Sequence, residues 1–291
     1  MPFLELSFAL DGMDPDQAEH ACIALGALSV SYSDARDDAV YEPRAGEIRL
    51  WPATRVQALY PASCADPALL RALAQALGID PQRLCARALA DRAWEREWLR
   101  DFHAMRFGRR LWICPRHESV EAVGATVVRL DPGLAFGTGT HASTALCLHW
   151  LDGADLAGRE LIDYGCGSGV LAIAALKLGA RRAHCFDIDP QALTATHENA
   201  MDNGVADRLR ICERDAELPC DAELLLANIL CDVLCALAPR FAELVVAGGR
   251  ILLCGILADE ATTVTAHYSA WFDMQPYRDA GGWAALCGTR R

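Results

Sequence analysis

The chain of 291 residues is long enough for about two domains, and its hydrophobic fraction of 53% can fill a core in each. Its formal net charge is −12 and Lys177 is its only lysine, which argues against a nucleic-acid-binding protein and favours a cationic partner. No apolar run could span a bilayer, and the N-terminal MPFLELSFALDGMD lacks the basic segment of a signal peptide. We therefore expect a cytoplasmic protein that binds neither a membrane nor nucleic acid.

The cysteines also indicate a reducing compartment. There are 13 of them, they form no CxxC pair, and most lie among apolar neighbours, as small buried thiols do. No group of Cys and His residues has the spacing of zinc ligands, so we predict no metal site.

The first ninety residues carry a regular succession of strand and helix signals. Residues 3–8 alternate as a strand does, and Asp14 as N-cap with Pro15 at the first helical position begins a helix. Asp66 and Pro67 repeat that signal for a second helix. Further strands are predicted at residues 28–32, 48–51 and 84–89. The order βαββαβ predicts a small ferredoxin-like α+β domain over residues 1–90, a common interaction module.

A charged segment at residues 91–103 follows. Trp94 and Trp98 lie four residues apart and therefore on one helix face. Because the segment falls where the first pattern ends, we predict a linker helix that leads to a second domain at residues 104–291. An ordinary packed helix is the alternative.

A glycine-rich loop, LDPGLAFGTGTHAST at residues 130–144, leads into an apolar helix at about 145–151. Its glycines free the backbone, and Thr140 and Thr144 supply hydroxyl groups where the loop enters the helix. This composition favours a loop that folds over a ligand, with Phe136 at its centre. His141 is interpreted as a loop-packing or ligand-contacting residue. A surface loop with a capped helix is the simpler alternative.

The most informative stretch is DYGCGSGVL at residues 163–171. It indicates a buried strand, a turn at Gly165, Gly167 and Gly169, and a helix whose free N–H groups face a ligand. A dinucleotide site would show GxGxxG, but here the glycines alternate and Val170 follows. Asp163 is expected to accept hydrogen bonds from N–H groups of the loop itself.

Two acids follow the next strand, at residues 183–187. Asp189 precedes Pro190 and is predicted to cap the helix at residues 190–203. Asp187 lies at the carboxyl end of the strand about 20 residues after the glycines, where a carboxylate accepts both hydroxyls of a ribose. We predict Asp187 as a ribose ligand, with a plain strand-end acid as the alternative.

The remaining segments continue the alternation of strands and helices. A buried strand in LLLANIL, residues 224–230, brings Asn228 to the same edge of the predicted sheet, either as a site residue or as the cap of a helix at 231–237. A turn at Gly248 and Gly249, a strand at 250–255, a helix at 258–267 and a hairpin of 271–276 with 284–288 complete a doubly wound α/β domain.

Two of these motifs carry a resemblance to a known family. The glycine turn resembles motif I of class I S-adenosylmethionine-dependent methyltransferases. The string at residues 130–144 closely resembles the signature of the bacterial ribosomal protein L11 methyltransferases. The resemblance is strong from about residue 130 to 230 and only architectural before residue 91. It implies a Rossmann-like doubly wound class I methyltransferase domain preceded by the ferredoxin-like domain.

The resemblance also implies a reaction and a site. The cofactor would be S-adenosylmethionine, and the acceptors would be lysine side-chain and N-terminal amino groups of the basic ribosomal protein L11, recognised by the first domain. Relatives that methylate planar amides or bases carry Asn-Pro-Pro-aromatic where Ile229 and Leu230 follow Asn228 here, which favours an aliphatic amine. Asn228 is the implied catalytic residue, because a neutral amine must be oriented toward the methyl group. The implied cofactor-binding residues are Phe136, Thr140, Thr144, Gly165, Gly167, Asp187 and Asn228.

Three alternatives stay open. The first is another S-adenosylmethionine-dependent amine methyltransferase. A nicotinamide-dependent oxidoreductase would also use the glycine turn and Asp187, but it leaves Asn228 and the Phe136 loop unexplained. A non-catalytic ribosome-assembly factor with a vestigial pocket is disfavoured by the joint presence of Thr144, Gly165, Asp187 and Asn228.

Overall fold

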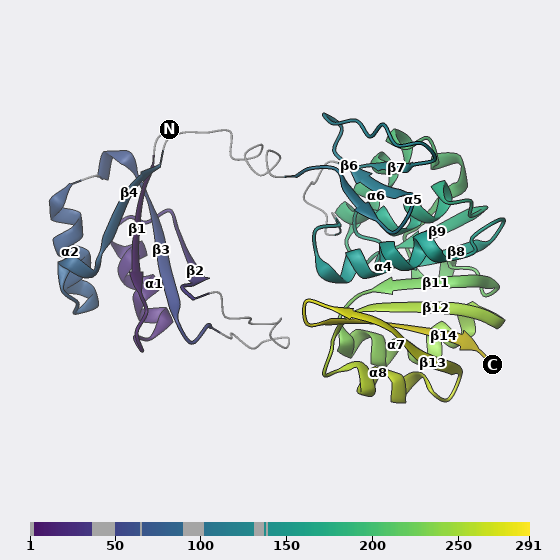
Figure 1. Ribbon diagram of the computed structural model, residues 1–291. Helices are drawn as coiled ribbons and strands as arrows, with labels where there is room; N and C mark the ends of the chain where they lie inside the picture. The colour runs from purple at the N-terminus through teal and green to yellow at the C-terminus, as the bar shows by residue number, and fades with distance from the viewer. Residues whose placement is uncertain (1–2, 37–49, 65, 90–101, 131–136, 138) are drawn as a thin grey trace. The chain divides into compact units, whose positions relative to one another are not determined.

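The computed structural model describes residues 3–36, 50–64, 66–89, 102–130, 137 and 139–291 (Figure 1). The chain separates into two compact units, Met1–Glu97 and Trp98–Arg291. The predicted linker helix at residues 91–103 lies almost entirely outside the described residues, and so do residues 131–136, which include Phe136, and residue 138 of its loop. No helix in the described ranges is long and apolar enough to cross a membrane.

The first unit confirms the predicted ferredoxin-like order. Its sheet has the strand order β2-β3-β1-β4, and every neighbouring pair is antiparallel. Leu6, Phe8 and Tyr60 are fully or almost fully buried in its core. The elements are β1 (Phe3–Ala9), α1 (Pro15–Ala24), β2 (Ser29–Asp34), β3 (Thr54–Pro61), α2 (Pro67–Leu77) and β4 (Cys85–Leu89).

Both helices of this unit begin where the sequence predicted. The Asp14 carboxylate accepts the N–H of Asp16 at 3.1 Å, and the Asp66 carboxylate accepts the N–H of Ala68 at 2.8 Å. Each cap satisfies one N–H group that the first helical turn leaves unpaired. The positions of these helices therefore follow from local signals.

The strand predicted at residues 48–51 is wrong. Leu50 and Trp51 belong to no strand, and residues 48 and 49 lie outside the described ranges. The strand here is β3, in which Thr54, Val56, Ala58 and Tyr60 are buried while the residues between them are more exposed. This alternation with a period of two is the strand signal, whereas Leu50 packs against the core without belonging to a strand.

The second unit is built on a seven-stranded sheet of order β10-β9-β8-β11-β12-β14-β13. All pairs from β10 to β12 are parallel, and the pairs of β14 with β12 and with β13 are antiparallel. The strands are β8 (Glu160–Tyr164), β9 (Arg182–Phe186), β10 (Leu209–Cys212), β11 (Ala222–Asn228), β12 (Val245–Leu257), β13 (Phe272–Ala280) and β14 (Trp283–Arg290).

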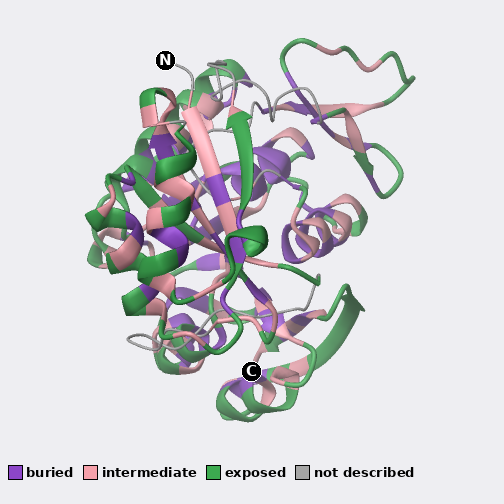
Figure 2. Ribbon diagram, turned by 90° about the vertical axis from the view of Figure 1, so that its left-hand side faces the viewer, coloured by how far each residue is buried: buried purple, intermediate pink, exposed green. Residues whose placement is uncertain are grey.

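Helices cover both faces of this sheet, as a doubly wound fold requires (Figure 1). One core joins the sheet to α4 (Ala142–Gly153), α5 (Val170–Lys177) and α6 (Pro190–Asp202). A second core joins the opposite face to α7 (Cys231–Leu244) and α8 (Ala261–Tyr268). Figure 2 shows the buried residues gathered in the strands and on the inner sides of the helices. This architecture confirms the predicted fold class.

A smaller sheet of three strands, which the sequence analysis did not predict, precedes α4. It consists of β5 (Met105–Phe107), β6 (Leu111–Cys114) and β7 (Thr126–Arg129). The buried Asp152 of α4 accepts the backbone N–H groups of Arg109, Arg110 and Leu111 at 2.6, 3.1 and 3.0 Å. One carboxylate thus fixes the β5–β6 turn against α4.

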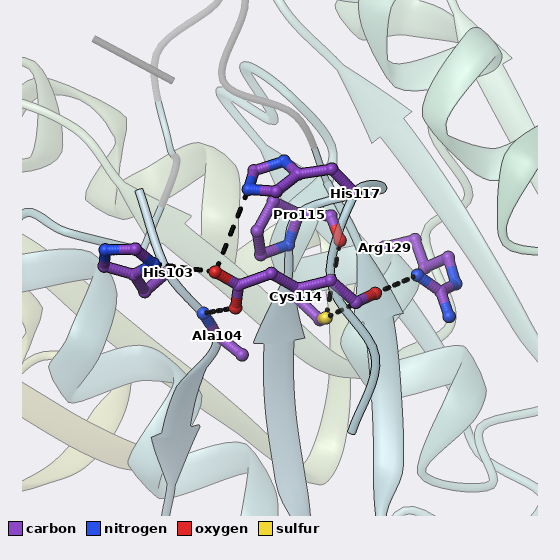
Figure 3. A network of polar contacts seen from close by, with 7 residues as sticks. His103, Ala104, Cys114, Pro115, His117 and Arg129 are labelled. Atoms are coloured by element: carbon purple, nitrogen blue, oxygen red, sulfur yellow. Dashed lines mark hydrogen bonds and ion pairs between the residues drawn. The ribbon is translucent and has the colours of Figure 1, made fainter. Parts of the chain in front are cut away.

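A polar network holds the loop between β6 and β7 (Figure 3). The Glu118 carboxylate pairs with His103 at 2.7 Å and accepts the N–H of Ala104 at 2.8 Å, and these contacts lower the pKa of Glu118. The Glu118 carbonyl accepts a hydrogen bond from Arg129 at 3.0 Å. Asn203 bonds the Arg129 N–H and carbonyl at 2.8 and 2.7 Å. The end of β7 is therefore fixed directly before the loop at residues 130–144.

Three boundaries in the last third of the chain differ from the predicted ones. The glycine pair Gly248–Gly249 lies inside β12. A Cβ at Gly249 would come within 2.7 Å of the Val245 side chain, so that position has no room for a larger residue. The helix predicted at 231–237 continues to Leu244 despite Pro239. Helix α8 begins at Ala261 rather than 258. The predicted final hairpin is present, with longer strands.

Candidate active site

Candidate site residues gather at the carboxyl ends of the parallel strands. The strand order reverses at β8, which has β9 on one side and β11 on the other. In open α/β sheets, ligands bind outside the carboxyl ends of the strands at such a reversal. The glycine turn follows β8, Asp187 follows β9, and Asn228 ends β11.

The glycine turn has a backbone that glycine adopts readily and other residues do not, as its sequence predicted. Gly165, Gly167 and Gly169 have φ angles of 76°, 54° and 77°, a region that residues with a Cβ rarely adopt. The Gly165 N–H donates to the Phe186 carbonyl at 2.8 Å, and Thr196 of α6 donates to the Gly167 carbonyl at 2.9 Å. The turn is thus held by β9 and α6, and it directs the N-terminus of α5 to the ligand edge of the sheet.

Close packing also demands glycine at two of these positions. A Cβ at Gly165 would come within 2.4 Å of the Ile229 side chain. A Cβ at Gly169 would come within 2.7 Å of the Thr196 side chain. Both distances are shorter than any real carbon contact, so the glycines provide room as well as conformation.

Asp187 and Asp189 have the different roles that their positions predicted. Asp189 caps α6 by accepting the N–H of Gln191 at 2.9 Å. Asp187 accepts the N–H of Gly167 at 2.9 Å through Oδ2 and that of Asp189 at 3.0 Å through Oδ1. Each carboxylate oxygen of Asp187 keeps a second lone pair, and the side chain is half-buried. Asp187 can therefore brace the glycine turn and still accept two hydroxyl groups.

A cavity of about 650 Å³ opens beside Asp187. Ile188, Leu193 and Ile211 give it apolar walls, and Ile188 is 90% exposed. Such a wall suits a flat heterocycle linked to the sugar that Asp187 would hold. The sequence analysis missed Ile188, although its place directly after the strand-end acid is a usable signal.

Asp163 lies beneath the turn and is 1% exposed. Its Oδ2 accepts the N–H of Ala172 at 3.0 Å, whereas no described residue bonds its Oδ1. Burial raises the pKa of Asp163 from 3.8 to about 7, and the Ala172 bond only partly opposes this. The sequence analysis expected donors in the loop, but the donor belongs to the first turn of α5.

The upstream loop reaches the same edge of the sheet. The Ser168 hydroxyl of the glycine turn donates to the Gly137 carbonyl at 2.7 Å, which ties the two motifs together. Thr140 is exposed where the loop ends. His141 caps α4, since its Nδ1 accepts the N–H of Ser143 at 3.3 Å. His141 is therefore a helix-capping residue, consistent with the loop-packing role predicted for it.

Thr144 and Asn228 meet, although 84 residues separate them. Asn228 Nδ2 donates to the Thr144 hydroxyl at 3.2 Å, and Thr144 is 1% exposed in the first turn of α4. Within the described part of the chain, no hydrogen bond is made to Asn228 Oδ1. The amide thus has one end fixed on α4 and a carbonyl oxygen available for a ligand.

Asn228 does not cap the helix that follows it. Leu230 occupies the N-cap position of α7, and no side chain bonds the helix there. Between them, Ile229 fills the space that Gly165 and Gly255 leave open, since a Cβ on either glycine would lie 2.4 Å from it. The capping alternative is therefore wrong.

The final hairpin adds a residue that the sequence analysis missed. The Trp283 ring lies edge-on against the His141 ring, with centroids 4.7 Å apart. A Cβ at Gly281 would contact Ala142 at 3.4 Å, so the hairpin turn packs on the start of α4. Nothing in the local sequence around Trp283 indicates this long-range contact.

Comparisons with known proteins agree with this geometry. Residues 2–291 match the family model described as "Ribosomal protein L11 methyltransferase (PrmA)". The chain belongs to this family. It is 47% identical to the ribosomal protein L11 methyltransferase of Pseudomonas aeruginosa (strain LESB58), covering 100% of this chain and 99% of that protein. It is equally similar, at 47%, to the relative from Alkalilimnicola ehrlichii, with 100% of both chains covered.

A solved structure is similar as well. The crystal structure of ribosomal protein L11 methylase from Lactobacillus delbrueckii subsp. bulgaricus shares 32% identity and a TM-score of 0.60. The matched region covers 65% of this chain and 100% of the Lactobacillus chain. Family membership confirms the predicted enzyme class, an S-adenosylmethionine-dependent methyltransferase, and disfavours the oxidoreductase and the assembly factor.

Proposed function

We propose that this protein transfers methyl groups from S-adenosylmethionine to lysine side-chain and N-terminal amino groups of ribosomal protein L11. The observation that carries the proposal is the Asn228 amide, fixed by Thr144 beside the glycine turn and followed by aliphatic residues. An aromatic residue after Asn228 would favour a planar acceptor, and none is present there. The relatives' names supply the protein substrate.

The described residues fit the cofactor. The Gly165–Gly169 turn lets the backbone approach a ligand closely, and the N-terminus of α5 suits a carboxylate. Asp187 has lone pairs for the two ribose hydroxyls, and Ile188 with Ile211 suits the adenine ring. We assign Thr144, Gly165, Gly167, Asp187 and Asn228 to cofactor binding. Thr140 and Phe136, of which Phe136 lies outside the described ranges, complete the assignment.

The chemistry places one demand on the protein. When bound, S-adenosylmethionine supplies a methyl group already activated on a sulfonium, so the chain must orient a neutral amine. Lysine titrates near about 10.4 and an α-amine near about 8, and only the neutral forms carry a lone pair. Asn228 Oδ1 would accept an amine N–H and aim that lone pair, while Thr144 holds the amide in place. Asn228 is therefore our proposed catalytic residue.

The first unit would recognise the substrate. It has its own core and a fold common among interaction modules. We assign residues 1–90 to L11 recognition, 91–103 to the linker and 104–291 to catalysis. The acidic balance of the chain, −12, supports a basic partner.

The test is intact-mass analysis of purified L11 after incubation with the protein and S-adenosylmethionine. We expect successive additions of single methyl groups, and fragment masses that place them on amino groups. Asn228→Ala should abolish most of this modification. Asp207→Asn, at an exposed acid before the amino end of β10 and so at the opposite edge of the sheet from the site, should not alter it. An unchanged L11 mass with the unaltered protein would overturn the proposal.

A further inference from the structure

Helix α7 begins with two apolar side chains that point to solvent. Leu230, at the N-cap, is 48% exposed, and Val233 is 45% exposed. They are three residues apart and so adjacent on the helix surface. Cys231 and Leu234 turn into the core instead, at 8% and 0% exposure. The pair is therefore not part of the packing that holds α7 on the sheet.

Helix formation does not explain these residue types either. The N-cap position prefers Ser, Thr, Asp or Asn, whose side chains accept an N–H of the first turn. Leu230 makes no such bond, so the first N–H groups of α7 have no side-chain partner at the N-cap. A local rule broken at the edge of a site is typical of a residue kept for binding.

The position of the pair is fixed relative to Asn228. Strand β11 ends at Asn228, and Leu230, with φ −59° and ψ 145°, turns the chain into α7. Ile229 between them donates its N–H to Cys254 at 3.2 Å and fits against Gly165 and Gly255. Leu230 thus lies at the rim of the proposed acceptor site.

Carboxylates flank the apolar pair. Asp232 lies between them in the sequence, and both Asp232 and Glu260 act electrostatically on the Cys231 thiol. Within the described ranges neither carboxylate has an Arg, Lys or His partner within 4.0 Å. Glu260 accepts the N–H of Leu257 at 3.0 Å, which leaves its charge without a cationic partner among the described residues. An apolar surface beside negative charge of this kind complements an aliphatic stem in a basic protein.

We propose that Leu230 and Val233 contact the methylene stem of the substrate lysine and thereby favour ε-amino over α-amino acceptors. The inference rests on the proposed function, because it concerns the same acceptor site. An α-amine has no such stem and reaches Asn228 without this contact. The pair would therefore determine specificity without touching the reacting atoms.

The experiment compares two acceptors in one substrate. Full-length protein, S-adenosylmethionine and L11 are incubated, and the initial methylation rates of lysine and N-terminal peptides are followed by mass spectrometry. Losing one partly buried aliphatic contact should lower kcat/KM for the ε-amine roughly fivefold in Leu230→Ser or Val233→Ser. The α-amine rate should change less than about twofold, and Leu230→Met should restore the ε-amine rate.

Two controls distinguish a failure of this inference from a failure of the proposed function. Val123→Ser changes a fully exposed valine in the β6–β7 loop and should leave both rates unchanged. Calorimetric titration of the serine variants should give the wild-type dissociation constant for S-adenosylmethionine. Equal losses at both acceptors, or no loss at the ε-amine, would overturn the role of the pair. Absence of any amine methylation by the unaltered protein would instead overturn the proposed function.

Discussion

The stability of the Asp163→Asn variant relative to wild type should be higher at neutral pH than at acidic pH. The buried carboxyl has a pKa of about 7 in the folded state against 3.8 for an aspartate in water, mainly because burial disfavours its charge. Asparagine has the same size and keeps an oxygen for the Ala172 N–H, but it cannot ionise.

The magnitude follows from the two pKa values. The Asp163 carboxyl keeps its proton to a higher pH in the folded state than in the unfolded chain. The stability of the wild-type protein therefore falls progressively from about pH 4 to about pH 7, and the loss is complete above that. The difference between 3.8 and about 7, at roughly 1.4 kcal/mol per pH unit, amounts to roughly 4 kcal/mol. The asparagine N–H₂ group, placed where Oδ1 has no described partner, costs about 1–3 kcal/mol at every pH.

Urea unfolding of the ligand-free full-length chain between about pH 4 and pH 8 measures the effect. The free energy of unfolding of Asp163→Asn minus that of wild type should rise by roughly 3–4 kcal/mol across this range. Asp207→Asn, at an exposed acid of the same unit, should show no such rise. A difference that stays constant with pH would show that the folded carboxyl is ionised throughout, and the burial argument would be refuted.

Three further predictions concern the site and the sheet. Asp187→Ala should weaken S-adenosylmethionine binding by about 2–4 kcal/mol, whereas the helix-cap variant Asp189→Ala should cost about 1 kcal/mol of stability and leave affinity unchanged. If calorimetry gives the same dissociation constant of S-adenosylmethionine for Asp187→Ala and Asp189→Ala, Asp187 is not a ribose ligand. Asn228→Ala should lower kcat far more than it lowers cofactor affinity. Thr144→Val should lower kcat by a smaller factor, and Thr144→Ser should restore it. A wild-type kcat for Asn228→Ala or Thr144→Val would contradict the positioning role. His184 is 6% exposed and burial lowers its pKa, so the free energy of unfolding should fall as pH drops below about 6.5. His184→Gln should flatten that decline in urea titrations, and an unchanged decline would show that the buried histidine does not cause it.

The sequence predicted those features whose physics is local. An aspartate followed by proline gave the starts of α1, α2 and α6, because a side-chain cap and a fixed φ act within three residues. The alternating glycines predicted a turn with positive φ, whereas the bond of Asp187 to that turn was not predicted. These signals placed Gly165, Gly167, Asp187 and Asn228 at one edge of a sheet before any contact was known.

Features created by tertiary contact were not predictable in this way. The strands β5 and β6 have three and four residues, too few to show a period. Asn228 carries no mark that its partner is Thr144, and Trp283 none that it contacts His141. Asp163 was placed beneath the turn, but its donor depends on how α5 approaches β8. Each of these requires the packing of elements far apart in the chain.

Ile229 shows how such packing joins the two halves of the site. Its side chain occupies space that Gly165 leaves on the cofactor side, and its backbone occupies space that Gly255 leaves on β12. Since Asn228 precedes it directly, the backbone of Asn228 cannot shift without moving Ile229 against the glycine turn, and Thr144 holds the Asn228 amide. The glycine motif therefore does two things: its backbone adopts positive φ angles, and its lack of a side chain leaves room for Ile229. The Ile229 N–H also donates to the Cys254 carbonyl at 3.2 Å, a bond that proline could not make, so an aliphatic residue with a free N–H follows Asn228 here.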